Sequence, residues 1–182
     1  NAWLANQKQP PAIRWVKDYP TDPGYIGAQA ASIREHWQAH GRGEKLIMSC
    51  HGIPQRSVDR GDPYASQCHA TAQALATTLG LSPDQWLATF QSRFGAAKWL
   101  QPYTQPTLEE LARGGLKRVD ILCPGFPADC LETLEEISME CREAFLEHGG
   151  ETFNYIPCLN ERPDWIAALA DLATSRLSSV SA

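Results

Sequence analysis

The amino-acid sequence predicts an α/β fold, with an open, mainly parallel sheet of four to five strands and helices on both faces. Two observations predict this class. Short apolar runs of strand length alternate along the chain with longer segments whose apolar residues recur at helical spacing. Glycine or proline stands between most of these segments and marks the connections. Because a helix follows each strand, successive strands are expected to pair in parallel under a cover of helices.

Each expected strand is a short apolar run bounded by glycine, proline or polar residues. The strands are expected at Lys45–Cys50, Trp86–Gln91, Arg118–Cys123 and Thr152–Ile156. The helices are expected at Gly24–His40, Pro63–Leu79, Thr107–Arg113, Ala128–His148 and Pro163–Leu177. Residues 12–19 are expected to be extended. Asp62 is expected to cap the second helix, with Pro63 at its first position and Gly80 at its end.

The composition is that of an ordinary globular domain. The chain has 182 residues, of which 43% are hydrophobic and 20% are charged, enough to bury one sizeable core. No repeat or low-complexity linker divides it, so residues 1–182 are expected to form a single domain. The net charge is −5 and no basic patch with interleaved aromatic residues occurs, which excludes a typical nucleic-acid partner. No apolar stretch approaches a membrane span, so any membrane contact is expected to be peripheral.

Six cysteines are spread along the chain without a C-x-x-C pair. This spacing favours reduced, buried thiols over disulfides, and it gives little support to an iron–sulfur cluster. A cytoplasmic location is therefore expected.

Two motifs place chemically active side chains where expected strands end. The run Ser49–Pro54 carries His51 at the end of the first strand, and a glycine follows it directly. The strand Arg118–Cys123 leads through a short loop into an acidic helix that carries Glu132 near its start. Ligands of open α/β sheets bind at the carboxyl ends of the strands, so His51 and Glu132 are expected to face one another across a cleft. Such a pair can bind a metal ion or transfer protons.

The residues by themselves leave a second interpretation of these motifs open. A single histidine at a strand end is more often a hydrogen-bonded structural residue than a ligand. Glu132, Glu136 and Glu140 share one face of the expected helix, which suits a relay of iron or protons. An exposed acidic helix, in which Asp129 and Glu132 form a capping box, explains the same residues more simply.

The other histidines give weaker signals. His36 and His40 stand four positions apart near a helix end, a spacing that can bind zinc. Exposed side chains that complement the helix dipole are the simpler interpretation. His69 and His148 have no partner in the sequence and are interpreted as structural.

Three groups of segments, in this order, resemble the ferrochelatases, enzymes that insert ferrous iron into a porphyrin at the end of haem synthesis. They are Ser49–Pro54 with Arg60–Tyr64, Phe90–Gly95 with Trp99–Thr104, and Cys123–Glu136. The resemblance extends from about Tyr19 to Leu172 and matches the carboxyl-terminal half of a family whose members have two similar halves. It implies a chelatase-like, Rossmann-like domain of three layers. Residues 1–23 are expected to be a lead-in segment that joins or belongs to the missing half.

The resemblance implies roles for the acidic and imidazole side chains. We expect His51 and Glu132 to be both catalytic and metal-binding, with His51 taking pyrrole protons and Glu132 holding or passing iron. Glu136 is a candidate for a metal or proton relay, whereas Glu135 and Glu140 are expected to be structural.

The porphyrin contacts follow from the same resemblance. Trp99 and Tyr103 are expected to line the porphyrin cleft, where an aromatic ring stacks on the macrocycle. Arg93 and Lys98 are weaker candidates for contact with propionates, and surface charges explain them equally well. Many family members have histidine where this chain has Cys130, which leaves that position without an expected role.

In this scheme iron and porphyrin are substrates, and no tightly bound cofactor is expected. Some relatives hold an iron–sulfur cluster in a cysteine-rich tail, but residues 178–182 contain no cysteine, so no cluster is expected here. The amino-terminal half of the family supplies much of the porphyrin-binding wall. This chain is therefore expected to carry the metal-site residues, to need that missing half as a partner, and to be inactive alone.

Other classes of protein fit parts of the pattern. A chelatase for another tetrapyrrole, or a metal- or tetrapyrrole-binding module without catalysis, would use the same His51 and Glu132. The segments Trp99–Thr104 and Asp129–Glu136 favour the protoporphyrin enzyme. A nucleotide-binding Rossmann domain is disfavoured, because no G-x-G-x-x-G follows any expected strand.

Overall fold

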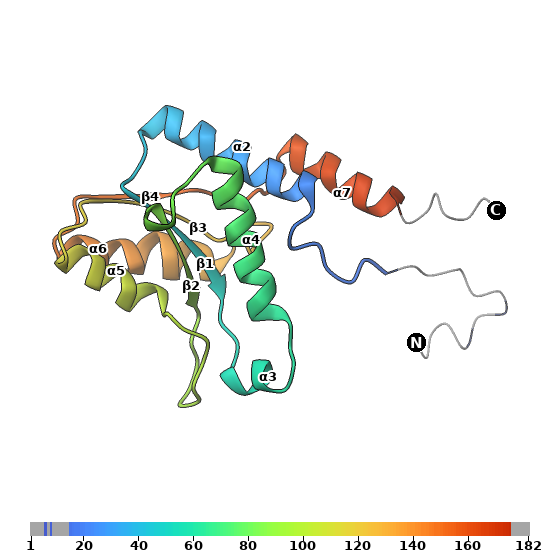
Figure 1. Ribbon diagram of the computed structural model, residues 1–182, viewed down its shortest axis with the longest axis horizontal. Helices are drawn as coiled ribbons and strands as arrows, with labels where there is room; N and C mark the ends of the chain where they lie inside the picture. Colours follow the sequence, from blue (N-terminus) through green and yellow to red (C-terminus); the bar gives the residue numbers. More distant parts are fainter. Residues whose placement is uncertain (1–5, 7, 9–14, 176–182) are drawn as a thin grey trace.

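The computed structural model describes residues 6, 8 and 15–175, and it contains one parallel sheet between two layers of helices (Figure 1). The strands are β1 (Lys45–His51), β2 (Trp86–Gln91), β3 (Arg118–Leu122) and β4 (Thr152–Tyr155). The α-helices are α2 (Pro23–His40), α3 (Gln55–Asp59), α4 (Tyr64–Leu79), α5 (Thr104–Arg113), α6 (Arg142–Glu147) and α7 (Pro163–Ser175). A 3₁₀ turn, η1 (Pro83–Gln85), precedes β2, and a π-helix, η2 (Glu132–Cys141), precedes α6.

The sheet confirms the predicted fold class. Its strand order is β2-β1-β3-β4, and all neighbouring strands are parallel. The chain leaves β1 for β2 on one side and then crosses to β3 on the other side of β1. A crevice forms at such a reversal of strand order, because the two connections run over opposite faces of the sheet. His51 ends β1 at this point, opposite Gln91 of β2.

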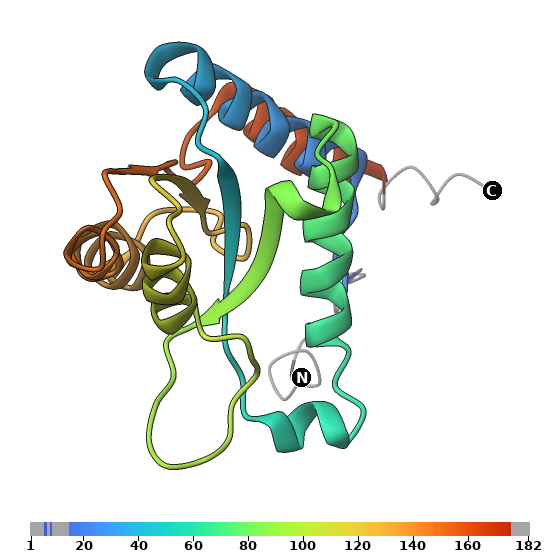
Figure 2. The same cartoon turned by 60° about the vertical axis from the view of Figure 1, so that its left-hand side comes forward.

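Helices cover both faces of the sheet and enclose two apolar layers. Figure 2 shows α2, α4 and α7 on one side of the strands and α5 and α6 on the other. Met48 packs with Ile33 and Leu75 in the first layer, and Ile47 packs with Phe145 in the second. Ile47 and Met48 are adjacent but point to opposite faces, as the pleat of a strand requires. Burial of each such side chain contributes about 1.5–3 kcal/mol.

The predicted helix Ala128–His148 is wrong in its start and in its type. Residues 128–130 form a loop, η2 has π-helical hydrogen bonds, and α6 alone is an α-helix. The buried residues of η2 are Thr133, Ile137 and Cys141, at equal intervals of four. Intervals of four keep three residues near one face of either an α-helix or a π-helix, so this spacing does not distinguish the two.

Smaller differences from the sequence predictions concern helix ends. α3 was not predicted because it has no buried residue and so shows no apolar periodicity. α5 begins at Thr104 rather than Thr107, because the buried Thr104 side chain belongs to its first turn. α4 begins at Tyr64 rather than Pro63, so Pro63 and not Asp62 holds the N-cap position. Asp62 Oδ1 accepts a hydrogen bond from the Tyr64 amide at 3.0 Å in the turn before the helix.

Several predictions fall partly beyond the described residues. Within the predicted lead-in 1–23, the described residues 6, 8 and 15–22 contain no helix or strand, whereas Pro23 begins α2. Residues 12–14 of the expected extended segment, the end of the last helix at Leu177 and residues 178–182 lie outside the described part. Among the described helices, none combines the length and the apolar character needed to cross a membrane.

A buried carboxylate joins β3 to its neighbours near the amino ends of the strands. Asp120 is 1% exposed and accepts hydrogen bonds from the indole of Trp37, the amide of Gly43 and the side chain of Asn154, at 2.6, 2.7 and 2.8 Å. A Cβ at Gly43 would lie 2.8 Å from the carboxylate, so glycine permits this approach. Three neutral donors thus satisfy one buried charge and fix the turn before β1.

Candidate active site

The loops after β1 and β2 are tied together at the carboxyl edge of the sheet. The Gly52 amide donates a hydrogen bond to the Gln91 carbonyl at 2.8 Å, and the Leu100 amide donates to the Ile53 carbonyl at 3.0 Å. A Cβ at Gly52 would lie 2.9 Å from the Gln91 carbonyl and 3.2 Å from the Trp99 ring. Glycine therefore allows the two loops to meet beside the end of β1.

His51 is half-buried, and its ring is held from three directions. Nδ1 lies 2.6 Å from the carbonyl oxygen of Gly52. An Nδ1–H group that donates to this carbonyl leaves the lone pair on Nε2. The ring centres of Trp99 and Phe126 lie 6.3 and 6.2 Å from that of the imidazole. Nε2 is thus the atom of His51 that can accept a proton or ligate a metal ion.

Glu132 is exposed at the first position of η2, at the same edge of the sheet. A hydrogen bond from Cys130 and one from its own amide lower the pKa of its carboxyl below the usual range, and a protonated His51 would lower it further. His51 ends β1 and Glu132 begins η2, so both lie at the carboxyl edge of the sheet. Glu132 is therefore ionised at neutral pH and open to a cation.

A buried chain of hydrogen bonds connects the sheet to the first turn of η2. Gln91 Nε2 donates to the carbonyl oxygen of Glu132 at 2.7 Å. Gln91 Oε1 accepts from the Ser49 hydroxyl at 2.8 Å and from the Cys123 thiol at 3.4 Å. The Ser49 hydroxyl also lies 2.7 Å from that of Thr104. Gln91 thereby fixes the backbone position from which the Glu132 side chain projects.

Glu136 is held by the end of β2. Its Oε1 accepts from the Ser92 amide at 2.6 Å, and its Oε2 accepts from the Ser92 hydroxyl at 2.6 Å. Ser92 has φ 61°, a left-handed conformation that is uncommon for residues other than glycine. The carboxylate satisfies the amide that this turn presents. Glu136 also borders a hollow of about 340 Å³.

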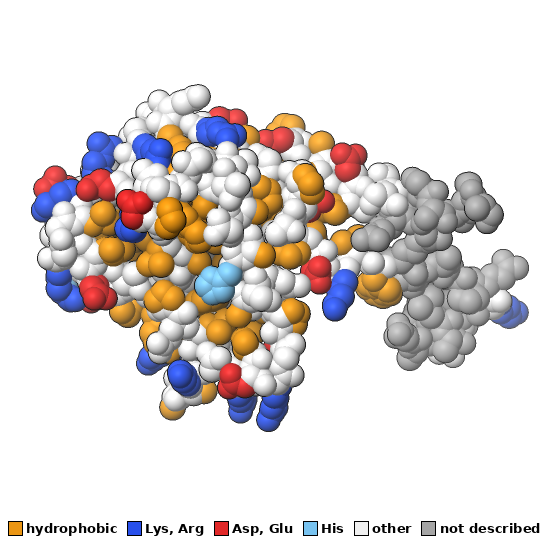
Figure 3. Space-filling model, in the orientation of Figure 1, with side chains coloured by type: hydrophobic (Ala, Val, Ile, Leu, Met, Phe, Trp, Pro, Cys, Tyr) orange, Lys and Arg blue, Asp and Glu red, His pale blue; other side chains and the backbone are white. Residues whose placement is uncertain are grey.

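The two aromatic residues that were expected to line the porphyrin cleft have different neighbours. Trp99 packs beside His51, whereas Tyr103 lines the hollow bordered by Glu136. The guanidinium of Arg93 lies 5.1 Å from the centre of the Tyr103 ring. Lys98 is exposed. In Figure 3, Lys and Arg side chains project at the lower edge, where α3 and the loop between β2 and α5 lie in Figure 1.

The capping box between Asp129 and Glu132 does not form. Asp129 instead accepts hydrogen bonds from the Tyr155 hydroxyl at 2.5 Å and the Asn160 side chain at 2.8 Å. Burial alone would raise the pKa of Asp129, but these bonds and those from Cys158 outweigh it, so the pKa lies below its usual range. Asp129 therefore ties the loop before η2 to the loop after β4.

The remaining histidines lie away from this edge or serve the helices. The rings of His36 and His40 lie 4.5 Å apart on α2, and His36 is half-buried rather than exposed as expected. Burial, with repulsion by His40, lowers the pKa of His36. His148 bonds a carbonyl of its own helix at 2.7 Å, and His69 is exposed on α4. Their contacts fit the structural interpretation of His69 and His148.

The described residues contain no group of three histidine, cysteine, aspartate or glutamate side chains that could hold a metal ion. At the carboxyl edge, His51 has an imidazole nitrogen and Glu132 an exposed carboxylate, both of which are ligand types for divalent cations. The six cysteines are free thiols, five of them buried as predicted, and Cys130 is half-buried.

The sequence analysis missed three residues that shape the site: Gln91, Ser92 and Phe126. Gln91 and Ser92 directly follow the apolar run of β2 and so lie at a strand end. The same position made His51 a candidate, and it could have identified these two residues as well. Phe126 lies in a proline-containing loop after β3, where no periodicity indicates which side chain turns inward.

A family model and curated relatives both match nearly the whole chain. A family model described as Ferrochelatase matches residues 1–177. The ferrochelatase of Aromatoleum aromaticum is 60% identical over 174 residues, which cover 96% of this chain and 48% of that protein. Those of Azoarcus sp. and Bordetella pertussis are 61% and 58% identical over 166 and 167 residues, covering 91% and 92% of this chain and 46% of each relative. The chain thus spans about half the length of the curated relatives it matches.

Proposed function

Since the chain belongs to the ferrochelatase family, we propose that it forms the metal-handling half of a lyase that inserts ferrous iron into protoporphyrin IX. This reaction releases two pyrrole protons and is the last step of haem biosynthesis. Iron and porphyrin are its substrates, and the proposal includes no tightly bound cofactor.

The observation that carries the proposal is the imidazole and the open carboxylate at one crevice of the sheet. Loss of protons from pyrrole nitrogens requires a base that works near neutral pH, and Nε2 of His51 has the free lone pair for it. Divalent iron requires an anionic ligand as it sheds water, and the exposed Glu132 supplies one. We therefore assign proton abstraction to His51, and the holding or passing of iron to Glu132.

Glu136 is the proposed continuation of this acidic path. It lies four residues beyond Glu132 on η2 and borders the hollow lined by Arg93 and Tyr103. Its two bonds to Ser92 hold it at the end of β2, where a second carboxylate can relay a cation or a proton. Glu135 and Glu140 are assigned no part in the relay.

The porphyrin is proposed to lie against Trp99, which is already packed beside His51. A macrocycle stacked there would bring its pyrrole nitrogens toward Nε2. Lys98 stands next to Trp99 in the exposed loop, and its charge suits a propionate. Tyr103 is a less direct contact, because it lines the hollow that Glu136 borders.

The missing length of the relatives is proposed to complete the porphyrin pocket. The chain by itself would then carry the iron-site residues without the wall that holds the macrocycle, and it would be inactive. A cytoplasmic location with at most peripheral membrane contact is part of the same proposal.

The test is an insertion assay under exclusion of oxygen, with ferrous iron, protoporphyrin IX and either the full-length protein or residues 1–182. We expect haem absorption to develop with the full-length protein and not with residues 1–182. Failure of the full-length protein to form haem would refute the proposal. If it then metallates another tetrapyrrole or takes cobalt instead, it is a related chelatase. If calorimetry shows tight iron binding without any insertion, it is a binding module.

A further inference from the structure

Two cysteine side chains meet on the face of β1 opposite to His51. Cys50 directly precedes His51, so the alternation of the strand points Cys50 toward α4. There it packs with Cys68 of α4 in an apolar cluster that includes Phe90 and Leu100. Cys50 and Cys68 are 3% and 7% exposed. β1 and α4 thus bring two free thiols together.

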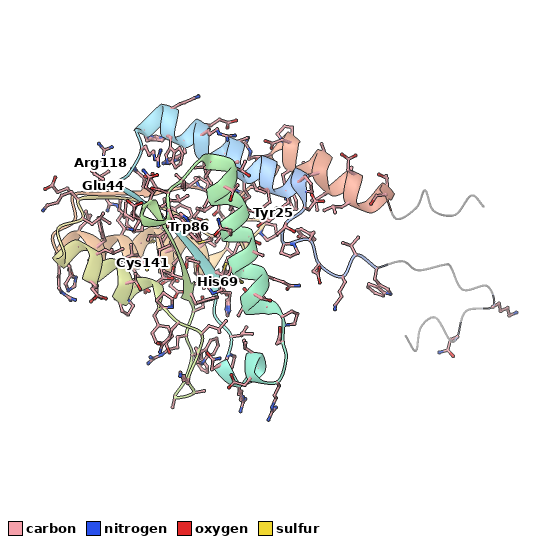
Figure 4. All side chains as sticks on the ribbon, viewed as in Figure 1. Tyr25, Glu44, His69, Trp86, Arg118 and Cys141 are labelled. Atoms are coloured by element: carbon pink, nitrogen blue, oxygen red, sulfur yellow. The ribbon has the colours of Figure 1, made fainter. Side chains whose placement is uncertain are left out.

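Both thiols line one cavity of about 220 Å³. Its wall includes Tyr25 of α2 and Tyr64 of α4, and Figure 4 shows Tyr25 beside the helix α4. The exposed Asp18 also lines it, so the cavity reaches the surface. A space several times the volume of one water molecule has room for a small oxidant beside both cysteines.

The two thiols are chemically unequal. The Cys68 sulfur accepts hydrogen bonds from the Cys50 thiol and from the Tyr64 hydroxyl, and both lower the pKa of Cys68. By contrast, burial raises the pKa of Cys141 and Cys158 to about 12. Because a thiolate is the nucleophile in thiol oxidation, Cys68 is the reactive member, and Cys50 is the thiol in contact with it.

We propose that Cys50 and Cys68 form a redox-active dithiol that a hydroperoxide converts to a disulfide. The sulfur of Cys68 attacks one peroxide oxygen and loses its proton, the O–O bond breaks, a sulfenic acid forms, and the displaced hydroxide takes that proton and leaves as water. The sulfur of Cys50 then attacks the sulfenic sulfur, and the displaced hydroxide takes the thiol proton and leaves as water. In total two thiols lose two electrons and two protons, and hydrogen peroxide is reduced to two molecules of water. The disulfide links the end of β1, next to His51, to α4, and a thiol reductant reverses it.

The test uses the full-length protein treated with hydrogen peroxide, followed by alkylation of free thiols under denaturing conditions, proteolysis and mass spectrometry. We expect a linked peptide that contains Cys50 and Cys68, two hydrogens lighter than the sum of its parts and absent after reduction. In Cys50→Ser, dimedone should label Cys68, because no second thiol removes its sulfenic acid. The matched control Cys141→Ser should keep the linked peptide.

The inference is overturned if Cys50 and Cys68 both stay reduced after peroxide treatment, and so become alkylated, while Cys130, the half-buried thiol, is oxidised first. Dimedone labelling of Cys50 in Cys68→Ser at the rate of Cys68 in Cys50→Ser would contradict the assignment of the nucleophile. If either serine variant fails to fold, as judged by circular dichroism, the linked peptide of the unsubstituted protein still decides. None of these measurements uses iron insertion, so the result is independent of the proposed function.

Discussion

The two edges of the sheet use charged side chains in opposite ways. At the amino edge, Asp120 accepts bonds from three neutral donors and is almost fully buried. Glu44 accepts bonds from the amides of Lys117 and Arg118 at 2.9 and 2.8 Å, and Figure 4 shows Glu44 and Arg118 together there. Each of these carboxylates holds one loop against the next strand.

At the carboxyl edge, the groups that can react are left open. Nε2 of His51 keeps its lone pair, and Glu132 is exposed. The polar groups that are saturated there, Gln91 and Asp129, lie behind these two and hold the backbone that carries them. The contrast teaches that the bonding partners of a carboxylate indicate its role: the saturated Asp120 stabilises the fold, whereas the exposed Glu132 remains free to bind a cation.

The strongest test of this contrast is to remove the open groups. His51→Ala and Glu132→Gln in the full-length protein should each lower the rate of iron insertion by about 100-fold or more, since a positioned acid or base contributes at least this much. Thermal unfolding should change little, because neither side chain is buried. Glu135→Gln, an exposed neighbour on η2, is the matched control. If both variants insert iron at near-native rates, the assignment of these residues is wrong.

Removing the saturated carboxylate at the amino edge should act on stability instead. Asp120→Ala leaves the donors of Trp37, Gly43 and Asn154 unpaired, which should cost about 3 kcal/mol of unfolding free energy. Urea unfolding measures this loss, and Asp120→Asn, which keeps an acceptor, should lose less. The insertion rate per folded molecule should stay unchanged. A loss of activity in Asp120→Asn without a loss of stability would contradict the division between the two edges.

An intermediate effect is expected for the network behind the site. Gln91→Leu removes the donor to the Glu132 carbonyl and should lower kcat for insertion roughly tenfold while KM changes little, because the first turn of η2 loses its anchor. Gln91→Glu keeps the shape and the acceptor but loses the donor, so it should lower kcat as well. If Gln91→Leu lowers stability but leaves kcat unchanged, Gln91 supports the fold and does not position Glu132.

The smallest effect concerns pH and Asp129. Its folded pKa lies below the ordinary 3.8, so its contribution to stability is present above that pH and is lost as the pH falls through the lowered folded value. Asp129→Asn should therefore be less stable than the unsubstituted protein at pH 7, by roughly 1 kcal/mol after solvent screening. Urea titrations at decreasing pH should show this difference shrinking below about pH 4. A difference that is constant with pH would show that the charge of Asp129 contributes nothing.

Particular elements show how far the sequence could be interpreted alone. β2 was predicted at Trp86–Gln91 and lies there, because a buried strand between turn residues leaves a local apolar signature. The π-helix was predicted as an α-helix, since intervals of four fit both patterns roughly and the deciding hydrogen bonds are not visible in residue types. The sequence indicated Glu136 as a candidate relay but did not indicate its partner Ser92, because the two residues are 44 positions apart in the chain.

The sequence by itself determined the class of fold, the bounds of the strands and of α2, α4 and α5 within a few residues, the start of α7, and the placement of His51 at a strand end. Each of these depends on the order of apolar and turn-forming residues over a short stretch, which the chain carries locally. Only the tertiary structure decided which carboxylates are saturated and which are open, and that Cys50 meets Cys68 behind His51. Such contacts between residues remote in the sequence depend on how distant segments pack, and no local pattern of residues predicts that geometry.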